Sequence, residues 1–171
     1  GEKFLLANVK DWGGGDYQDI QSGIDELIKR GIADPEKLGQ GGWSYGGYMT
    51  MWAVTQTDRF AAGVAGAGIA SWQSYYGQNK IDTWMLPFFG ASVYDDPKVY
   101  AKSSPIEFIK KAKTPTLVLH GTEDAVVDSR NAALLGLRIP DARVELFPGA
   151  GHLFFWEQPE PVADTVGEFL A

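Results

Sequence analysis

The stretch Gly42-Trp43-Ser44-Tyr45-Gly46 places a serine between two glycines, at a point where a strand is expected to turn into a helix. Residues 37–43 suit a short buried strand, and residues 45–57 predict a helix with Met49, Trp52 and Ala53 on one side. Small residues permit the sharp turn that lifts a hydroxyl to the end of a sheet, at the positive end of a helix. We interpret this stretch as a nucleophile elbow. The alternative is a glycine-rich turn with an incidental serine, in a chain that holds 21 glycines.

Helical and strand-like segments alternate on both sides of this turn. Apolar residues at helical spacing predict a helix over residues 16–30, with Asp16 as its cap and Gly31 at its end. Further strands are expected at residues 60–69, 116–119 and 144–147, and further helices at residues 104–111, 128–137 and 161–170. The expected caps of the first two of these helices are Ser104 and either Asp128 or Ser129. This alternation predicts an α/β fold in one catalytic domain (residues 1–171), with a mainly parallel sheet and helices on both faces.

A serine nucleophile needs a neighbouring base, and the chain offers two histidines, His120 and His152. His152 follows the strand at residues 144–147 in a glycine-rich loop that can bring an imidazole over the edge of the sheet. His120 ends an apolar strand and precedes Gly121, so we interpret it as structural, with the role of base as the alternative. We therefore expect His152 to be the base.

The acid that orients the base should follow a strand between the nucleophile and the base in chain order. Asp124 fits this position. Its competitors are Glu123, which we expect to face solvent, and Asp128, which is well placed to cap the following helix. The order Ser44, Asp124, His152 is that of the α/β-hydrolases.

The sequence resembles the catalytic domain of the prolyl oligopeptidase family, especially its acylaminoacyl-peptidase branch. The resemblance rests on DWGGGDYQD (residues 11–19), GWSYGGYM (residues 42–49), and TPTL (residues 114–117) with His120, Gly121 and Asp124. After Asp124, RVELFPGAGH (residues 143–152) and FFWEQP (residues 154–159) are more similar to small α/β-hydrolase esterases. Both resemblances imply the same roles for Asp124 and His152.

The resemblance also implies strands and a loop before the segment that starts at Gly1, so we expect a truncated α/β-hydrolase. The backbone N–H of Tyr45 is the expected oxyanion donor, and the usual second donor belongs to that earlier loop. Loss of one donor lowers the rate by about 10²–10³-fold, so a slow enzyme is expected. The strand before Ser44 would have an exposed edge, which predicts a homo-oligomer that covers it.

An incomplete oxyanion hole should favour esters over amides, because an alkoxide leaves more readily than an amine. The sequence therefore predicts a carboxylesterase that acts on short acyl esters through an acyl-enzyme on Ser44. The alternative is a serine peptidase that acts on short peptides, as the family resemblance implies. A second alternative is an inactive, hydrolase-derived binding domain.

Aromatic residues are dense between residues 72 and 89 and on either side of the nucleophile. One interpretation makes them ordinary core residues, and the other makes them a lid and acyl pocket over Ser44. The candidate substrate contacts are Trp43, Tyr45, Trp72, Tyr75, Tyr76, Trp84, Phe88 and Phe89.

Composition narrows the classes of partner. A formal charge of -7 and the lack of a basic run longer than Lys110-Lys111 argue against nucleic acid. The absence of cysteine excludes disulfides and a thiol nucleophile, and no ligand-spaced cluster predicts a metal or another cofactor. No apolar run could span a membrane and no signal pattern is present, so we expect a soluble, mature, cytoplasmic protein.

Overall fold

The computed structural model describes residues 1–79 and 82–171. In these residues the sheet has four strands in the order β1-β2-β3-β4, and every neighbouring pair is parallel. The strands are β1 (Gly39–Trp43), β2 (Ala62–Gly66), β3 (Thr116–Gly121) and β4 (Ala142–Phe147). The predicted α/β class with a parallel sheet is therefore confirmed.

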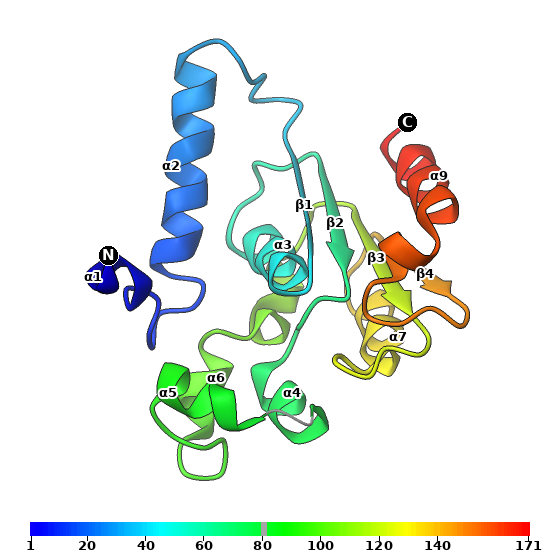
Figure 1. Ribbon diagram of the computed structural model, residues 1–171. Coiled ribbons are helices and arrows are strands. Elements are labelled where there is room, and N and C mark those ends of the chain that lie inside the picture. Colours follow the sequence, from blue (N-terminus) through cyan, green and yellow to red (C-terminus); the bar gives the residue numbers. More distant parts are fainter. Residues whose placement is uncertain (80–81) are drawn as a thin grey trace.

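Helices cover both faces of this sheet (Figure 1). On one face, α3 (Tyr45–Gln56), the 3₁₀ helix η2 (Pro105–Lys111) and α7 (Arg130–Gly136) pack on Ala65 and Val118. On the other face, α8 (Phe154–Glu157) and α9 (Pro159–Leu170) pack on Leu117 and Leu119. Successive residues of β3 thus serve opposite cores, as the alternation of side chains along a strand requires.

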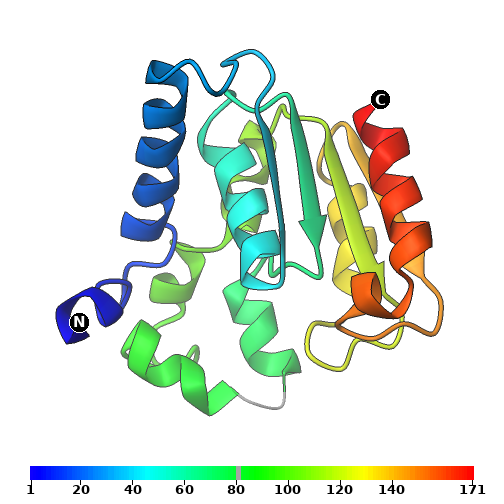
Figure 2. The same ribbon diagram turned by 45° about the horizontal axis from the view of Figure 1, so that its top comes forward.

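A third core is mainly aromatic and lies where α3 meets the segments before and after it. Its buried aromatic residues, which we call the aromatic cluster, are Trp12, Tyr17, Tyr48, Trp52, Phe60, Trp72, Tyr75, Phe89 and Tyr100. The other helices are α1 (Glu2–Leu5), α2 (Gly15–Lys29), α4 (Trp72–Gln78), η1 (Asp82–Trp84), α5 (Met85–Phe89) and α6 (Pro97–Ala101). Figure 2 shows α4 to α6 beyond the carboxyl end of β2. Among the described helices, none combines the length and the apolar character needed to cross a bilayer.

The start of α2 corrects one prediction. The helix begins at Gly15, with Gly14 at the N-cap, so Asp16 lies in the first turn and does not cap it. Asp11 does this instead, because its Oδ2 accepts a hydrogen bond of 2.8 Å from the N–H of Gly15. The expected end of the helix at Gly31 agrees with its positive φ of 70°.

Ser104 occupies the predicted N-cap position, but its side chain does not cap the helix. Residues 105–111 form a 3₁₀ helix rather than an α-helix, and Ser104 makes no side-chain cap bond to it. Its Oγ instead accepts from the N–H of Trp72 at 2.9 Å and donates to the carbonyl of Tyr100 at 2.8 Å. The tertiary contact with Trp72 outweighs the local preference for capping.

At the start of α7, one candidate cap occupies the N-cap position and the other makes the hydrogen bond. Ser129 occupies the N-cap position but makes no side-chain cap bond. Asp128 accepts the N–H of Arg130 at 3.0 Å. The hydrogen bond is therefore made by the residue before the N-cap.

Candidate active site

Ser44 lies on a strained turn between β1 and α3. Its φ is 57° and its ψ is -114°, a conformation that few non-glycine residues adopt. Neighbouring glycines allow this turn, because a Cβ on Gly42 would lie 2.6 Å from the main chain of Gly46. A Cβ on Gly47 would lie 2.4 Å from the carbonyl oxygen of Gly66. Close contact between backbones thus determines where the Ser44 hydroxyl points.

The side chains of Ser44, His152 and Asp124 form a connected hydrogen-bonded chain. Nε2 of His152 lies 3.1 Å from Oγ of Ser44, and Nδ1 of His152 lies 2.8 Å from Oδ2 of Asp124. The first distance is within reach for proton transfer to a base. Ser44 follows β1, Asp124 follows β3 and His152 follows β4, so the carboxyl ends of three parallel strands bring them together.

The carboxylate of Asp124 is inaccessible to solvent, with a side-chain exposure of 0%. Its Oδ1 accepts the N–H groups of Val126 at 2.8 Å and Val127 at 2.9 Å. Burial acts to raise the pKa of Asp124, but hydrogen bonds from His120, His152 and these two amides together lower it well below its usual value. Asp124 therefore stays ionised beside His152.

The two competing acids lie elsewhere. Glu123 is exposed, and its N–H donates to the carbonyl of Ala150 at 2.9 Å. Asp128 forms an ion pair with Arg130 and starts α7. The geometry brings only Asp124 of the three to His152.

Tyr45 follows the nucleophile and is the first residue of α3, where backbone N–H groups have no partner within the helix. Its hydroxyl donates a hydrogen bond of 2.5 Å to Oδ2 of Asp16. Burial and this hydrogen bond raise the pKa of Tyr45 far above its usual value, so the hydroxyl keeps its proton. The ring packs edge-on against Trp12, with 5.4 Å between centroids.

Trp43 lies against the base rather than on a separate substrate surface. Its indole N–H donates to the carbonyl of His152 at 2.7 Å, and the two ring centroids are 4.7 Å apart. Trp43 nevertheless remains partly accessible to solvent, with 37% of the residue exposed. A substrate contact by Trp43 stays a prediction.

The remaining expected substrate contacts lie in or against the aromatic cluster. Trp72 is completely buried, and Tyr75 and Phe89 are buried as well. Trp84 and Phe88 both pack on Trp12, with ring centroids 5.5 Å and 5.2 Å from it. These residues are core members in this geometry, and their contact with substrate stays a prediction.

Tyr76 is partly buried and packs against the aromatic cluster at Tyr100. Its ring lies edge-on to those of Tyr94 and Tyr100, at centroid distances of 5.9 Å and 5.6 Å. The role expected for Tyr76 in substrate binding also stays a prediction.

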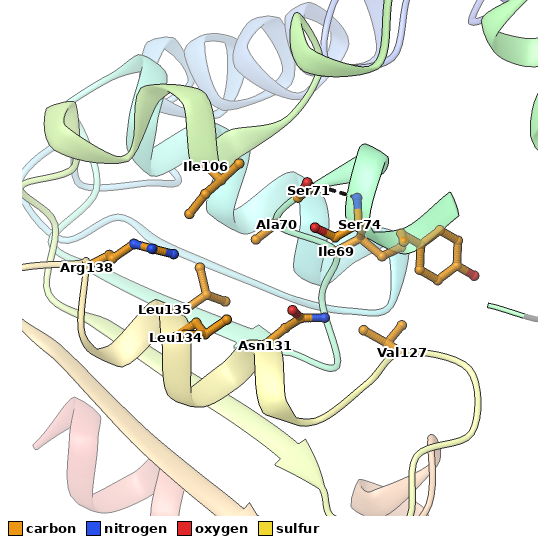
Figure 3. Close-up of a pocket in the computed structure, with 11 residues that line it drawn as sticks. Ile69, Ala70, Ser71, Ser74, Ile106, Val127, Asn131, Leu134, Leu135 and Arg138 are labelled. Carbon is orange, nitrogen blue, oxygen red and sulfur yellow. Dashed lines mark hydrogen bonds between the residues drawn. The ribbon is translucent and has the colours of Figure 1, made fainter. Parts of the chain in front are cut away.

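A cavity of about 70 Å³ lies near the loop that carries Asp124, between α4, η2 and α7 (Figure 3). Val127 lies at one end and Arg138 at the other, with Ile106 and Leu135 between them. Of the expected substrate contacts, only Tyr75 is among its described lining residues. Its lining is mainly apolar, which suits a hydrocarbon group better than a charged one.

Sequence reasoning did not predict the contacts that three polar residues make with this site. These are Asp16, which accepts from Tyr45, His120, which contacts Asp124, and Glu157, whose Oε2 accepts the N–H of Gly151 at 3.0 Å. Asp16 and Glu157 carried no signal that pointed to the site. His120 did, because it lies four residues before Asp124, near the end of the strand that Asp124 follows. Within the described residues, no group of three or more metal-ligating side chains is arranged around a common point.

The sequence of this chain is similar to a known protein family and to several known proteins. A family model described as the prolyl oligopeptidase family matches residues 1–162, which include both segments that resemble small esterases. The uncharacterized peptidase YuxL of Bacillus subtilis is 35% identical over 161 residues, which cover 89% of this chain and 24% of that protein. The acylamino-acid-releasing enzyme of Arabidopsis thaliana is 32% identical over 169 residues, 89% of this chain and 22% of that protein.

A solved structure shares the fold. The acylaminoacyl peptidase of Pyrococcus horikoshii superposes with a TM-score of 0.86 at 32% identity, over 92% of this chain and 27% of that one. The chain thus spans about a quarter of the length of the relatives it matches.

Proposed function

Because this chain belongs to the prolyl oligopeptidase family, we propose that it is a serine peptidase acting on short peptides, with Ser44 as the nucleophile. His152 is the general base and Asp124 is the acid that orients it. The observation that carries this proposal is the 3.1 Å contact between Nε2 of His152 and Oγ of Ser44, with Asp124 on the other ring nitrogen.

The reaction follows from this geometry. Nε2 of His152 takes the proton of the Ser44 hydroxyl as Oγ attacks the peptide carbonyl. The resulting imidazolium is stabilised by the buried carboxylate of Asp124, which stays ionised. His152 then gives the proton to the leaving amine, and water repeats the sequence to free the acyl group from Ser44.

The oxyanion of the tetrahedral intermediate is proposed to bind the N–H of Tyr45. This N–H lies at the start of α3, where the helix dipole also favours negative charge. The hydrogen bond from Tyr45 to Asp16 holds the side chain of the same residue. A second donor is expected to come from another segment, which makes the isolated site slow.

The ester preference expected from the sequence receives no specific support, and the peptidase alternative fits the comparisons better. The named relatives are a peptidase and an acylamino-acid-releasing enzyme, and the similar solved structure is an acylaminoacyl peptidase. An amine leaves only after it is protonated, so peptide cleavage depends on the imidazolium that Asp124 stabilises. A buried, ionised Asp124 is therefore compatible with amide substrates, although it would serve ester cleavage in the same way.

Two finer expectations remain proposals. In the described sheet, β1 pairs on one side only, with β2, and its other edge suits pairing with a second copy of the chain. A cytoplasmic location also stays a prediction.

The test compares an N-acyl amino-acid anilide with a nitrophenyl butyrate ester, using wild-type protein and Ser44→Ala. We expect turnover of both substrates, with loss of about 10⁴–10⁶-fold in the variant. Ester turnover without any anilide turnover would support the esterase. Equal rates for wild type and Ser44→Ala would leave the inactive binding domain as the better interpretation.

A further inference from the structure

His120 is the penultimate residue of β3, four residues before Asp124, and its side chain is almost completely buried, with 2% exposed. Its Nε2 lies 3.0 Å from the carbonyl oxygen of Val127 and 3.1 Å from Oδ2 of Asp124. A carbonyl oxygen and an ionised carboxylate oxygen can only accept hydrogen bonds. Nε2 of His120 must therefore carry a proton, which it shares between these two acceptors.

This N–H completes a closed arrangement around the acid. The N–H of Val127 donates to Oδ1 of Asp124, while the carbonyl of Val127 accepts from His120. His120 in turn reaches Oδ2, the same oxygen that contacts Nδ1 of His152. Oδ1 is thus fixed by the backbone, and Oδ2 is held between two imidazoles.

The two imidazoles differ in what they can do. His152 is 15% exposed and reaches Ser44, whereas His120 is buried and contacts atoms that cannot take part in proton transfer to substrate. Without His120, rotation about the bond to the Asp124 carboxyl would be opposed by the two amides at Oδ1 and, at Oδ2, by the His152 ring alone. Oδ2 could then move away from Nδ1 of His152 while both amide bonds survived.

We propose that His120 is a positioning residue that holds Oδ2 of Asp124 in line with His152; this inference rests on the proposed function of Ser44, His152 and Asp124. His120 acts through Asp124 and never touches substrate. Its loss should lower kcat, because a misplaced base slows the chemical step, and should leave KM nearly unchanged. A displacement of about 1 Å can lower a rate by about 10²-fold.

The test compares His120→Gln with His120→Asn. The side-chain amide of glutamine is long enough to place its nitrogen near the position of Nε2, whereas that of asparagine is too short. We expect His120→Gln to keep kcat for the anilide within about 5-fold of wild type, and His120→Asn to lower it by about 10- to 100-fold at unchanged KM. Thermal unfolding of both variants checks that the fold persists.

A second experiment tests whether His120 affects kcat through Asp124. In an Asp124→Asn background, measured with the more reactive nitrophenyl ester, we expect His120→Asn to change kcat by less than about 3-fold, because residues that act as one unit are not additive. The matched control is Thr116→Val, which removes another buried hydrogen bond from β3, the 2.8 Å bond to the carbonyl of Thr114. That control should keep wild-type kcat.

Two outcomes would overturn the inference: an unchanged kcat in His120→Asn, or the same loss in the Asp124→Asn background as in wild type. The second would mean that His120 only stabilises the fold. Failure of wild-type protein to turn over either substrate would instead contradict the proposed function.

Discussion

The hydroxyl of Tyr45 donates to Oδ2 of Asp16 at 2.5 Å, so the residue after the nucleophile is tied to the first turn of α2. Burial and this bond raise the pKa of Tyr45, and it remains a donor at any working pH. Tyr45→Phe removes the donor and keeps the ring. We expect the free energy of unfolding to fall by about 1.5–3 kcal/mol, as for other hydrogen bonds to charged groups, in urea titrations. Asp16→Asn, which keeps an acceptor oxygen, is the control, and equal stability of Tyr45→Phe and wild type would refute the contribution.

Replacement by alanine should have opposite effects on stability at two helical glycines, because only one of them lies against another backbone segment. Gly47→Ala would bring a Cβ to 2.4 Å from the carbonyl oxygen of Gly66, whereas a Cβ on Gly23 in α2 meets nothing within 4 Å. We expect Gly47→Ala to destabilise by about 1–3 kcal/mol or more and to lower activity. Gly23→Ala should stabilise by about 0.5–1 kcal/mol through helix propensity. Urea unfolding measures both, and a harmless Gly47→Ala would contradict the close approach.

The lowered pKa of Asp124 predicts that the free energy of unfolding decreases at acid pH. Since the unfolded chain takes up the proton at a higher pH than the folded chain, the carboxylate stabilises the fold fully above about pH 4. This contribution is lost as the pH falls towards the folded-state pKa, with a slope of at most about 1.4 kcal/mol per pH unit. Urea unfolding between pH 7 and pH 3 should show a shallower decline for Asp124→Asn than for wild type. Parallel declines would show that Asp124 is not the group responsible.

Trp43 links the strand before the nucleophile to the loop that carries the base. Its indole N–H bonds the carbonyl of His152 at 2.7 Å. Trp43→Phe keeps an aromatic ring and removes the donor, so we expect kcat for the anilide to fall by about 3- to 10-fold, in line with one hydrogen bond of about 1 kcal/mol. Leu153→Ala, on the same loop but exposed, is the control and should keep wild-type kcat. A Trp43→Phe variant with wild-type kcat would show that the bond does not position His152.

The exposed edge of β1 predicts self-association. We expect light scattering to give a mass that rises from one chain towards two as the protein concentration increases. A mass of one chain across the whole range would exclude pairing through this edge.

The parallel sheet and the meeting of Ser44, Asp124 and His152 could be predicted because each depends on local signals. The elbow needs small residues around Ser44, and the chain order of the three groups fixes which loops can converge. Contacts that join distant segments could not be predicted. The sequence predicts Asp16 as a helix cap, but its carboxylate bonds Tyr45, 29 residues away, and Asp11 bonds the N–H of Gly15 instead.

The contact between Ser104 and Trp72 is another that could not be predicted from sequence. A serine before a proline predicts a cap, yet the Ser104 hydroxyl bonds the main chain of Trp72, 32 residues away, inside the core. The density of aromatic residues was compatible with either a core or a pocket, and sequence could not reveal that Trp72 would be completely buried.

The central claim is that His152 activates Ser44, and labelling with a fluorophosphonate probe followed by peptide mass spectrometry tests it most directly. The account predicts one probe per chain, on Ser44, in wild-type protein, a much slower reaction in His152→Ala, and no label in Ser44→Ala or in heat-unfolded wild type. Folded wild-type protein that stays unlabelled, or carries the label on another residue, would contradict it.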